Sequence, residues 1–308
     1  MGIEERASPW KLGGLGWRQL GRRTGARVYK DDVLGRAAQL SYFFIFSLFP
    51  LLYFLASLLG YFTQTGPELR ESLWRYLASV VPVKATALIR DTLVEITEAS
   101  SGSKISFGVL LTIWTASFGV GAIISTLNAA YGVKESRPWW KVQAMAVGLT
   151  LALALFVVTA LALVLYGGQI GQFLADGYDL GAAFTAAWGV LQWIIVLGCV
   201  LLALALVYYC APDVKEIKWQ WITPGSLVAL GLWLLVSFAF RLYLRYFDTY
   251  STTYGSLGAV MILLLWLYLT GVAVLVGGEM NAVIEDAAAR AGVEDAKQRG
   301  EKSPGESA

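Results

Sequence analysis

The chain has 308 residues, of which 57% are hydrophobic and only 15% are charged, and its mean hydropathy is +0.59. A soluble protein of this length needs more charge on its surface, so the composition indicates an integral membrane protein. The net charge of +2 gives no reason to expect a nucleic-acid partner.

Histidine is absent from the sequence, which removes the commonest general base and the commonest transition-metal ligand. The two cysteines, Cys199 and Cys210, fall on one predicted helix about three turns apart, a separation too long for a disulfide. The sequence therefore predicts two free thiols, no metal site and no cofactor.

Residues 1–36 form a basic N-terminal segment. Trp17, Leu20, Thr24 and Val28 recur there at helical spacing, opposite much of the positive charge. This pattern is typical of a helix that lies on an anionic lipid surface. A solvated, partly disordered arm is the alternative.

Six apolar segments are each long enough to cross the roughly 30 Å hydrocarbon core as a helix. Their predicted bounds are Ala38–Phe62, Ile105–Val133, Val142–Tyr166, Leu180–Ala211, Trp219–Phe240 and Tyr254–Ala282. The last segment is the clearest, because no charged residue occurs between Asp248 and Glu279. The predicted fold is an all-α polytopic membrane protein with six transmembrane helices over residues 37–284.

Two further regions complete the predicted domain organisation. Residues 63–104 carry two amphipathic stripes, which predict interfacial helices outside the cytoplasm. Residues 285–308 are rich in alanine and charge and predict a disordered cytoplasmic tail. With both termini inside, 17 of the 24 Lys and Arg residues lie on the cytoplasmic side, as the positive-inside rule requires.

Several positions in the apolar segments are predicted helix breaks: Pro50, Pro224, Gly225, Gly255 and Gly258. A broken helix exposes backbone groups to a cavity, as in transporters. Simple bends in packed helices are the alternative reading.

The order of several motifs resembles the BrkB/YihY family of bacterial inner-membrane proteins over residues 30–285. The motifs are Arg36-Ala-Ala-Gln-Leu-Ser-Tyr, Ser47-Leu-Phe-Pro-Leu, Trp114-Thr-Ala-Ser, Leu127-Asn128-Ala-Ala-Tyr, Arg137-Pro-Trp-Trp-Lys, Tyr208 with Pro212, Pro224-Gly225, Tyr254-Gly-Ser-Leu-Gly, Trp266-Leu-Tyr and Gly278-Glu279-Met-Asn281. The resemblance implies a fold and an inner-membrane location more than an activity. The family also carried a ribonuclease label, which these residues do not support, since they include no histidine and no carboxylate cluster for two metals.

Glu279, at the cytoplasmic end of the sixth predicted span, is the first candidate site residue. Arg36 begins the first span on the same side, so the two could form an ion pair that pins the helices together. Alternatively, Glu279 is a proton or substrate carboxylate at the mouth of a cavity. Asn281 and Asn128 occupy corresponding helix ends and are predicted to share this network.

Arg241 and Arg245 form the second candidate site, at the outer end of the fifth span. They are four residues apart and therefore lie on one helical face. They are either anchors that reach the lipid headgroups or a fork that recognises an anionic group.

These features favour a protein that moves a small solute or a lipid-like molecule. A non-transporting envelope scaffold or resistance factor is the alternative, and an intramembrane enzyme without an identifiable nucleophile–base pair is the third hypothesis. The expected partners are membrane lipids, a small-molecule or lipid substrate and a second copy of the chain, but no nucleic acid.

Overall fold

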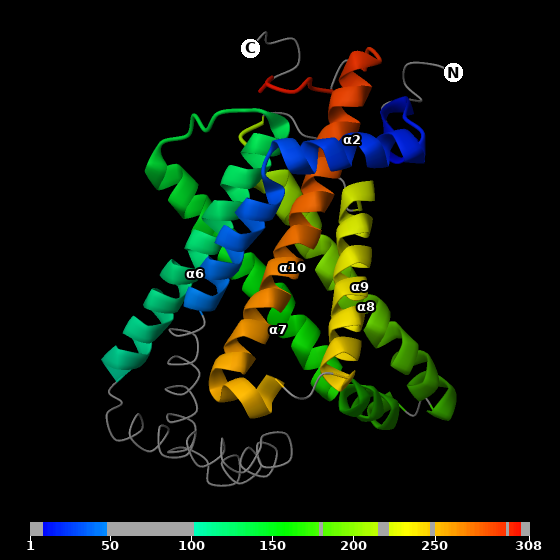
Figure 1. Ribbon diagram of the computed structural model, residues 1–308. Helices are drawn as coiled ribbons and strands as arrows, with labels where there is room; N and C mark the ends of the chain where they lie inside the picture. Colours follow the sequence, from blue (N-terminus) through cyan, green and yellow to red (C-terminus); the bar gives the residue numbers. More distant parts are fainter. Residues whose placement is uncertain are drawn as a thin grey trace. The chain divides into compact units, whose positions relative to one another are not determined.

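The computed structural model describes residues 9–47, 102–178, 181–214, 222–246, 250–293 and 296–302 (Figure 1). All regular secondary structure in these ranges is helical. Besides a helix over residues 33–47, the elements are η1 (Pro9–Gly14), α2 (Trp17–Lys30), α6 (Gly102–Tyr131), α7 (Trp139–Tyr178), α8 (Gly181–Cys210), α9 (Pro224–Tyr246) and α10 (Tyr250–Arg290). The chain divides into a larger unit, residues 1–42 with 119–308, and a smaller unit, Phe43–Phe118.

Five helices in the described part of the chain are long and apolar enough to span a membrane. They contain the segments Leu110–Tyr131, Trp139–Val164, Ala183–Cys210, Pro224–Tyr243 and Val260–Arg290. The prediction of an all-α polytopic membrane protein is confirmed. The first predicted span, Ala38–Phe62, lies mostly outside the described residues, as do nearly all of residues 63–104 and Pro50.

Helix α10 is the element on which the larger unit is assembled. Gly277 faces α9 and α8, where an added Cβ would collide with the carbonyl of Gly225 and the hydroxyl of Tyr208. The adjacent Gly278 faces Leu127 of α6 in the same way. Tyr208 also donates a 2.6 Å hydrogen bond to the carbonyl of Val274. These glycines let three helices approach the α10 backbone closely, as small residues do in membrane bundles.

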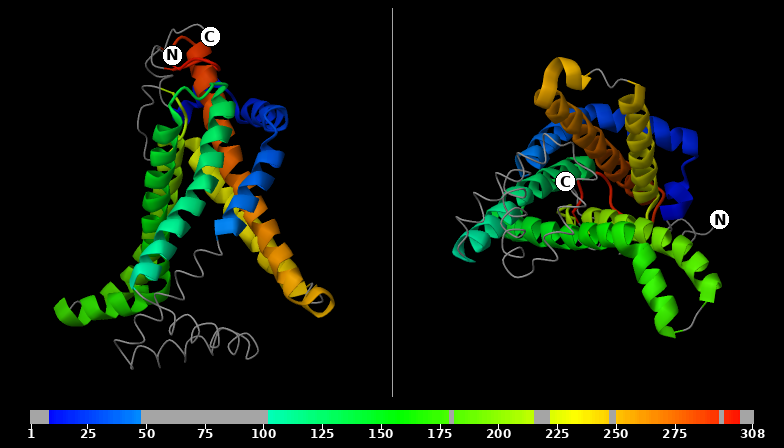
Figure 2. Two further views of the ribbon diagram at one scale, coloured as in Figure 1. Left: turned by 90° about the vertical axis from the view of Figure 1, so that its left-hand side faces the viewer. Right: turned by 90° about the horizontal axis from the view of Figure 1, so that it is seen from below.

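The N-terminal segment packs on the same helix. Figures 1 and 2 show α2 lying across α10 near its C-terminal end. Leu12 and Leu20 bury their side chains against Met280, Val283 and Ile284 of α10. The outer face of α2 exposes charged residues, so the helix is amphipathic, with hydrophobic burial holding one face in place. This segment is therefore ordered from Pro9 onward rather than a free arm.

The helix over residues 33–47 begins at Val33, immediately after the turn that ends α2. Val33 and Ala37 are fully buried against Leu275 of α10. Asp32 adopts a positive φ of 50° in the turn, which redirects the chain from α2 into this helix. The turn thus brings Asp31 and Arg36 towards the C-terminal part of α10.

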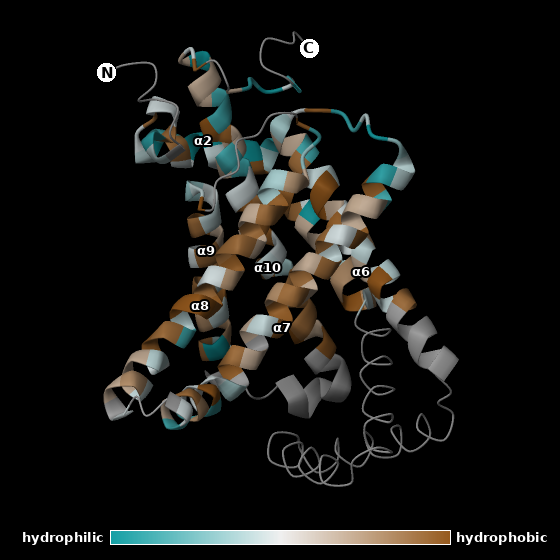
Figure 3. Cartoon of the chain, turned by 180° about the vertical axis from the view of Figure 1, so that it is seen from behind, coloured by the Kyte–Doolittle hydropathy of each residue, from teal (hydrophilic) through white to brown (hydrophobic). Residues whose placement is uncertain are grey.

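Helices α7 and α8 form an antiparallel hairpin (Figure 2). Gly167 and Gly171 on α7 present a glycine face on which Trp188 and Gln192 of α8 pack. The Trp188 indole donates a 2.6 Å hydrogen bond to the Gly167 carbonyl, which satisfies its only polar group. Figure 3 shows that α7 to α10 are mainly hydrophobic along their lengths, whereas hydrophilic residues gather at the end that carries α2.

In the smaller unit, the ring of Phe43 lies 6.4 Å from that of Phe118. Trp114 packs edge-on against Phe118 at 5.9 Å. The Ser117 hydroxyl donates a 2.6 Å hydrogen bond to the Trp114 carbonyl.

The structure corrects the predicted helix breaks that it describes. Pro224 is the first residue of α9, where its missing N–H costs nothing. Gly255 and Gly258 lie inside α10, which is assigned as helix from Tyr250 to Arg290.

Candidate functional site

Glu279 lies where α10 passes beneath α2 and the turn that follows it. Its side chain is 0% exposed. Neither of its carboxylate oxygens has a hydrogen-bond partner among the described residues. A buried polar group without a partner costs free energy, and a charged one costs far more. Glu279 is therefore the least satisfied acidic side chain that the structure describes.

Four charged side chains surround Glu279 and act on it electrostatically. They come from three places in the chain: α2 and the segment that follows it, the helix over residues 33–47, and the C-terminal residues. We call the set the Glu279 cluster, and it consists of Glu279, Arg27, Asp31, Arg36 and Arg299.

The arginines of this cluster are engaged elsewhere. Arg27 Nη2 donates to Asp286 at 2.5 Å, and Arg299 Nη2 donates to Asp31 Oδ1 at 2.6 Å. Arg36 Nε donates to the backbone carbonyl of Asp31 at 3.0 Å, rather than to Glu279. Burial lowers the pKa of Arg27 below its usual range, an effect that the charge of Asp286 opposes. The predicted ion pair between Arg36 and Glu279 does not form in the described structure.

Other buried polar atoms, on α2 and in the turn after it, also lack partners in the described part of the chain. They are Thr24 Oγ1, Arg27 Nη1 and Asp31 Oδ2. Thr24 lies on the buried face of α2, one turn from Arg27. Most buried polar groups in proteins are hydrogen-bonded, so a concentration of such atoms at one place marks it as a functional candidate.

Asn281 performs a different task at the start of α9. Its Oδ1 accepts a 3.0 Å hydrogen bond from the Gly225 amide, and its Nδ2 donates to Thr223 Oγ1 at 3.0 Å. Thr223 and Ser226 also cap each other reciprocally. Asn281 thereby satisfies one of the free amides at the N-terminus of α9.

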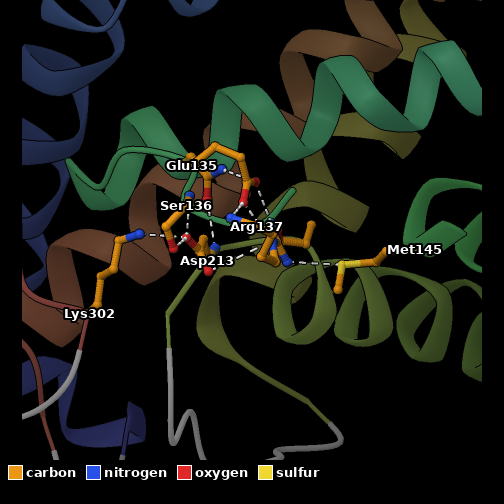
Figure 4. Close-up of polar contacts among 8 residues, drawn as sticks. Glu135, Ser136, Arg137, Met145, Asp213 and Lys302 are labelled. Atoms are coloured by element: carbon orange, nitrogen blue, oxygen red, sulfur yellow. Dashed lines mark hydrogen bonds and ion pairs between the residues drawn. The ribbon is translucent and has the colours of Figure 1, made fainter. Parts of the chain in front are cut away.

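Asn128 belongs to a second polar group, which Figure 4 shows. Its Nδ2 donates to Glu135 at 2.9 Å and its Oδ1 accepts from the Asp213 amide at 2.7 Å. This group joins the loop after α6 to the loop after α8 and to the C-terminal residues. We call it the loop cluster, and it consists of Asn128, Glu135, Ser136, Arg137, Asp213 and Lys302. Asn128 and Asn281 thus lie in separate networks, not in the shared one that was expected.

Arg137 is the centre of the loop cluster. It forms a fork on Glu135 at 2.6 and 2.7 Å and donates to the Ala211 carbonyl at 3.0 Å. These hydrogen bonds lower the pKa of Glu135, and the bond to Glu135 raises that of Arg137. Burial works against ionisation of Asp213, but hydrogen bonds from Lys302 and Ser136 outweigh it and lower the Asp213 pKa to about 2.

A hollow of about 230 Å³ lies beside the loop cluster. Its lining residues come from the C-terminal half of α6, the loop that follows and the start of α7: Gly121, Ile124, Ser125, Asn128, Ala129, Val133, Glu135 and Val142. The lining includes neither Glu279 nor Arg241.

The model of a family described as "Virulence factor BrkB" matches residues 24–302. The chain belongs to this family. A ribonuclease-like protein of Bacillus subtilis (strain 168), YfkH, is 32% identical over 249 residues, which cover 81% of this chain and 89% of that protein. No solved structure matches the chain.

Two UPF0761 membrane proteins are similar to a large part of the chain. The one from Stenotrophomonas maltophilia (strain R551-3) is 27% identical over 274 residues, covering 85% of this chain and 60% of its own length. One from Xanthomonas campestris pv. campestris (strain ATCC 33913) is 26% identical over 285 residues, covering 90% of this chain and 61% of its own. The chain therefore spans about 60% of the length of these two relatives. The predicted family is confirmed, and the protein is a membrane protein of the BrkB family.

The BrkB-family motifs that the sequence contains now have structural roles. In the Gly278-Glu279-Met-Asn281 motif, each residue that packs contacts a different element. Gly278 contacts α6, Met280 packs against the N-terminal segment that includes α2, and Asn281 bonds the start of α9. The Arg137-Pro-Trp-Trp-Lys motif supplies the guanidinium that ties two loops together. Among the described residues, no group of three or more His, Cys, Asp or Glu side chains could hold a metal ion, and Cys199 and Cys210 are free.

Arg241 and Arg245 are on α9, and Arg241 is exposed. Arg241 belongs to neither the Glu279 cluster nor the loop cluster. Both arginines remain predicted contacts for an anionic group.

The C-terminal residues correct the expectation of a disordered tail. Residues 296–302 return to the end of the bundle, where Gly300 donates its amide to the Tyr131 carbonyl at 2.9 Å. Arg299 bonds Asp31 and the Ala129 carbonyl, and Lys302 bonds Asp213. The polar composition of this segment gave no sign that it packs on the bundle. The two basic residues Arg299 and Lys302 indicate that the segment could form ion pairs. Their acidic partners could not be identified, because they lie far away in the sequence.

Proposed function

We propose that this BrkB-family protein moves a small solute or a lipid-like molecule across the bacterial inner membrane. One observation carries the proposal: Glu279 is a fully buried carboxylate on a membrane-spanning helix, and neither of its oxygens is hydrogen-bonded to a described residue. Ionisable side chains at such positions are costly, and they commonly mark a pathway for an ion or substrate.

The same proposal includes an orientation and a set of partners. Both termini face the cytoplasm, because α2, the loop after α6 and the C-terminal residues place most of the basic residues at one end of the larger unit. Membrane lipids are the partners of the outer face of α2, where Arg18, Arg22 and Lys30 are exposed beside Trp17 and Tyr29. A second copy of the chain is a further partner.

The test is transport by the purified protein in proteoliposomes made from phosphatidylethanolamine and phosphatidylglycerol. Lipid movement is followed with NBD-labelled phosphatidylglycerol and dithionite, and solute movement with a panel of small neutral, cationic and anionic tracers. We expect flux of at least one probe in the wild type. We expect Glu279→Gln to insert normally but to lose that flux, because it removes the charge without changing the size of the side chain. Glu285→Gln on the same helix is the matched control and keeps the flux.

An envelope scaffold is the second candidate. The observation in its favour is that the lining of the hollow beside Asn128 includes neither Glu279 nor Arg241. Absence of flux in the wild type, with partners bound equally by the wild type and by Glu279→Gln, would favour the scaffold. Full flux in Glu279→Gln would mean that the Glu279 carboxylate has no role in transport and that the side chain serves only packing.

A further inference from the structure

The charges around Glu279 indicate which class of ligand it could bind. The charged and titratable groups that act on it come from five other parts of the chain: Arg27 on α2, Asp31 in the turn, Arg36 on the helix over residues 33–47, Arg299 in the C-terminal segment and Tyr131 on α6. Arg27 in turn bonds Asp286 of α10, so a ligand must be compatible with three arginines and three carboxylates.

The arginines do not form an anion site. Arg299 is held by Asp31 Oδ1 and the Ala129 carbonyl, and Arg36 by the Asp31 carbonyl. Arg27 has one nitrogen on Asp286 and one without a described partner. An anion placed here would also meet the carboxylates of Glu279 and Asp31, so like-charge repulsion opposes it.

The atoms without described partners are mostly oxygens. They are both carboxylate oxygens of Glu279, Oδ2 of Asp31 and the hydroxyl of Thr24, against a single nitrogen of Arg27. Carboxylate and hydroxyl oxygens are ligands of hard cations and acceptors of protons. Counting Asp286, the three arginines and the three carboxylates balance, so a single positive charge is the most that this place accepts.

We propose that Glu279, together with Asp31, binds a small monovalent cation, either a proton or Na⁺. Given the proposed transport function, this cation is the coupling ion, and Glu279 is its principal ligand. Asp31 contributes Oδ2, while its Oδ1 stays on Arg299. The C-terminal segment is thereby attached directly to the cation site through Arg299.

The experiment measures the rate at which a carboxyl reagent modifies Glu279, and it needs no transport substrate. The wild-type protein in detergent, free of sodium, is treated with dicyclohexylcarbodiimide, which reacts with buried carboxylic acids, and modification of Glu279 is followed by mass spectrometry. Modification of Glu285 on the same helix is the internal reference. Choline chloride replaces NaCl at equal ionic strength.

If Na⁺ is the ligand, NaCl at ten times its dissociation constant slows modification of Glu279 about tenfold and leaves Glu285 unchanged. If the proton is the ligand, NaCl has no effect, and modification of Glu279 persists to a higher pH than modification of Glu285. No modification of Glu279 in sodium-free buffer, or equal responses of Glu279 and Glu285 to sodium and pH, would overturn the cation site.

A second readout uses thermal unfolding of the wild type, Glu279→Gln and Glu285→Gln. The site predicts a midpoint that depends on sodium or on pH in the wild type and in Glu285→Gln, with that dependence lost in Glu279→Gln. Flux in proteoliposomes without any effect of sodium or pH on Glu279 would overturn the cation site but not the transport function. Cation binding without flux of any probe would support the cation site and overturn the transport function.

Discussion

Two polar clusters lie in the larger unit, and they use the same residue types with opposite results. In the loop cluster, Glu135 and Asp213 each accept hydrogen bonds from several donors, among them Arg137, Ser136 and Lys302. In the Glu279 cluster, three arginines surround Glu279 and none of them bonds it in the described structure. Charge alone therefore does not explain the difference.

Backbone geometry explains it. The loop cluster is built on connections between helices, whose free amides, such as those of Ser136 and Asp213, can turn towards side chains. Glu279 projects from the middle of a helix whose backbone groups are already used, and its neighbours bond one another. Charge-assisted hydrogen bonds stabilise the first cluster. The second holds an unsatisfied carboxylate in place, as expected of a functional group rather than a structural one.

The largest expected effect comes from breaking the loop cluster with Arg137→Ala. The change removes both hydrogen bonds from the guanidinium to the Glu135 carboxylate and the hydrogen bond to the Ala211 carbonyl. The side chains of Arg137 and Glu135 are 16% and 30% exposed, and losing their charged hydrogen bonds costs about 2–3 kcal/mol. We expect the thermal midpoint of the purified protein to fall by about 5 °C or more. Lys134→Ala, an exposed change in the same loop, is the control, and equal midpoints for the two variants would contradict a stabilising role.

A smaller effect is expected from Gly225→Ala, which tests the packing beside the Glu279 cluster. The new methyl would collide with the Gly277 carbonyl and Asn281 Oδ1, so α9 must move away from α10. Such overpacking costs about 1–3 kcal/mol. Gly231→Ala on the same helix has open space and is expected to be neutral. Differential scanning fluorimetry of both variants checks this, and similar stabilities would mean that α9 and α10 are not in close contact.

The pH dependence separates the clusters further. The pKa of Asp213 is lowered from 3.8 to about 2, so its contribution to stability is complete above the ordinary value and is lost as the pH falls from about 4 through about 2. We expect the thermal midpoint to fall across this window in the wild type and to change less in Asp213→Asn. If the thermal midpoints of the two proteins changed equally with pH, Asp213 would not contribute to stability through its ionisation.

Much of the fold follows from local sequence, because apolar length is a property of each segment by itself. The spans that contain Trp114, Trp193 and Trp266 were predicted in this way, and the five described ones are helical. The importance of Glu279 could also be suspected, since a carboxylate ends an otherwise uncharged run. Its lack of a partner could not, because this depends on where Arg27, Arg36 and Arg299 find their own bonds.

The separation of Asn128 from Asn281 illustrates the same limit. Both are amides at helix ends with similar neighbours in sequence, and both were placed in one network. The structure assigns Asn128 to two loops and Asn281 to the first turn of α9. Only the pairing of helices distinguishes them, and this pairing is set by glycines such as Gly277 and Gly278, whose contacts are not local.

The smallest expected effect tests the segment that joins the clusters. Arg299 bonds Asp31 of the Glu279 cluster, and Lys302 bonds Asp213 of the loop cluster. Arg299→Ala should release the segment, so that the Gly300 amide, now bonded to Tyr131, exchanges faster with deuterium, while the thermal midpoint changes by only a few degrees. Arg290→Ala is the control, because the Arg290 side chain is 62% exposed although it also contacts Asp286. Unchanged exchange at Gly300 in Arg299→Ala would mean that the segment is held by its backbone contacts alone. In that case the two clusters would be independent of each other, and the cation site would have no link to the C-terminal residues.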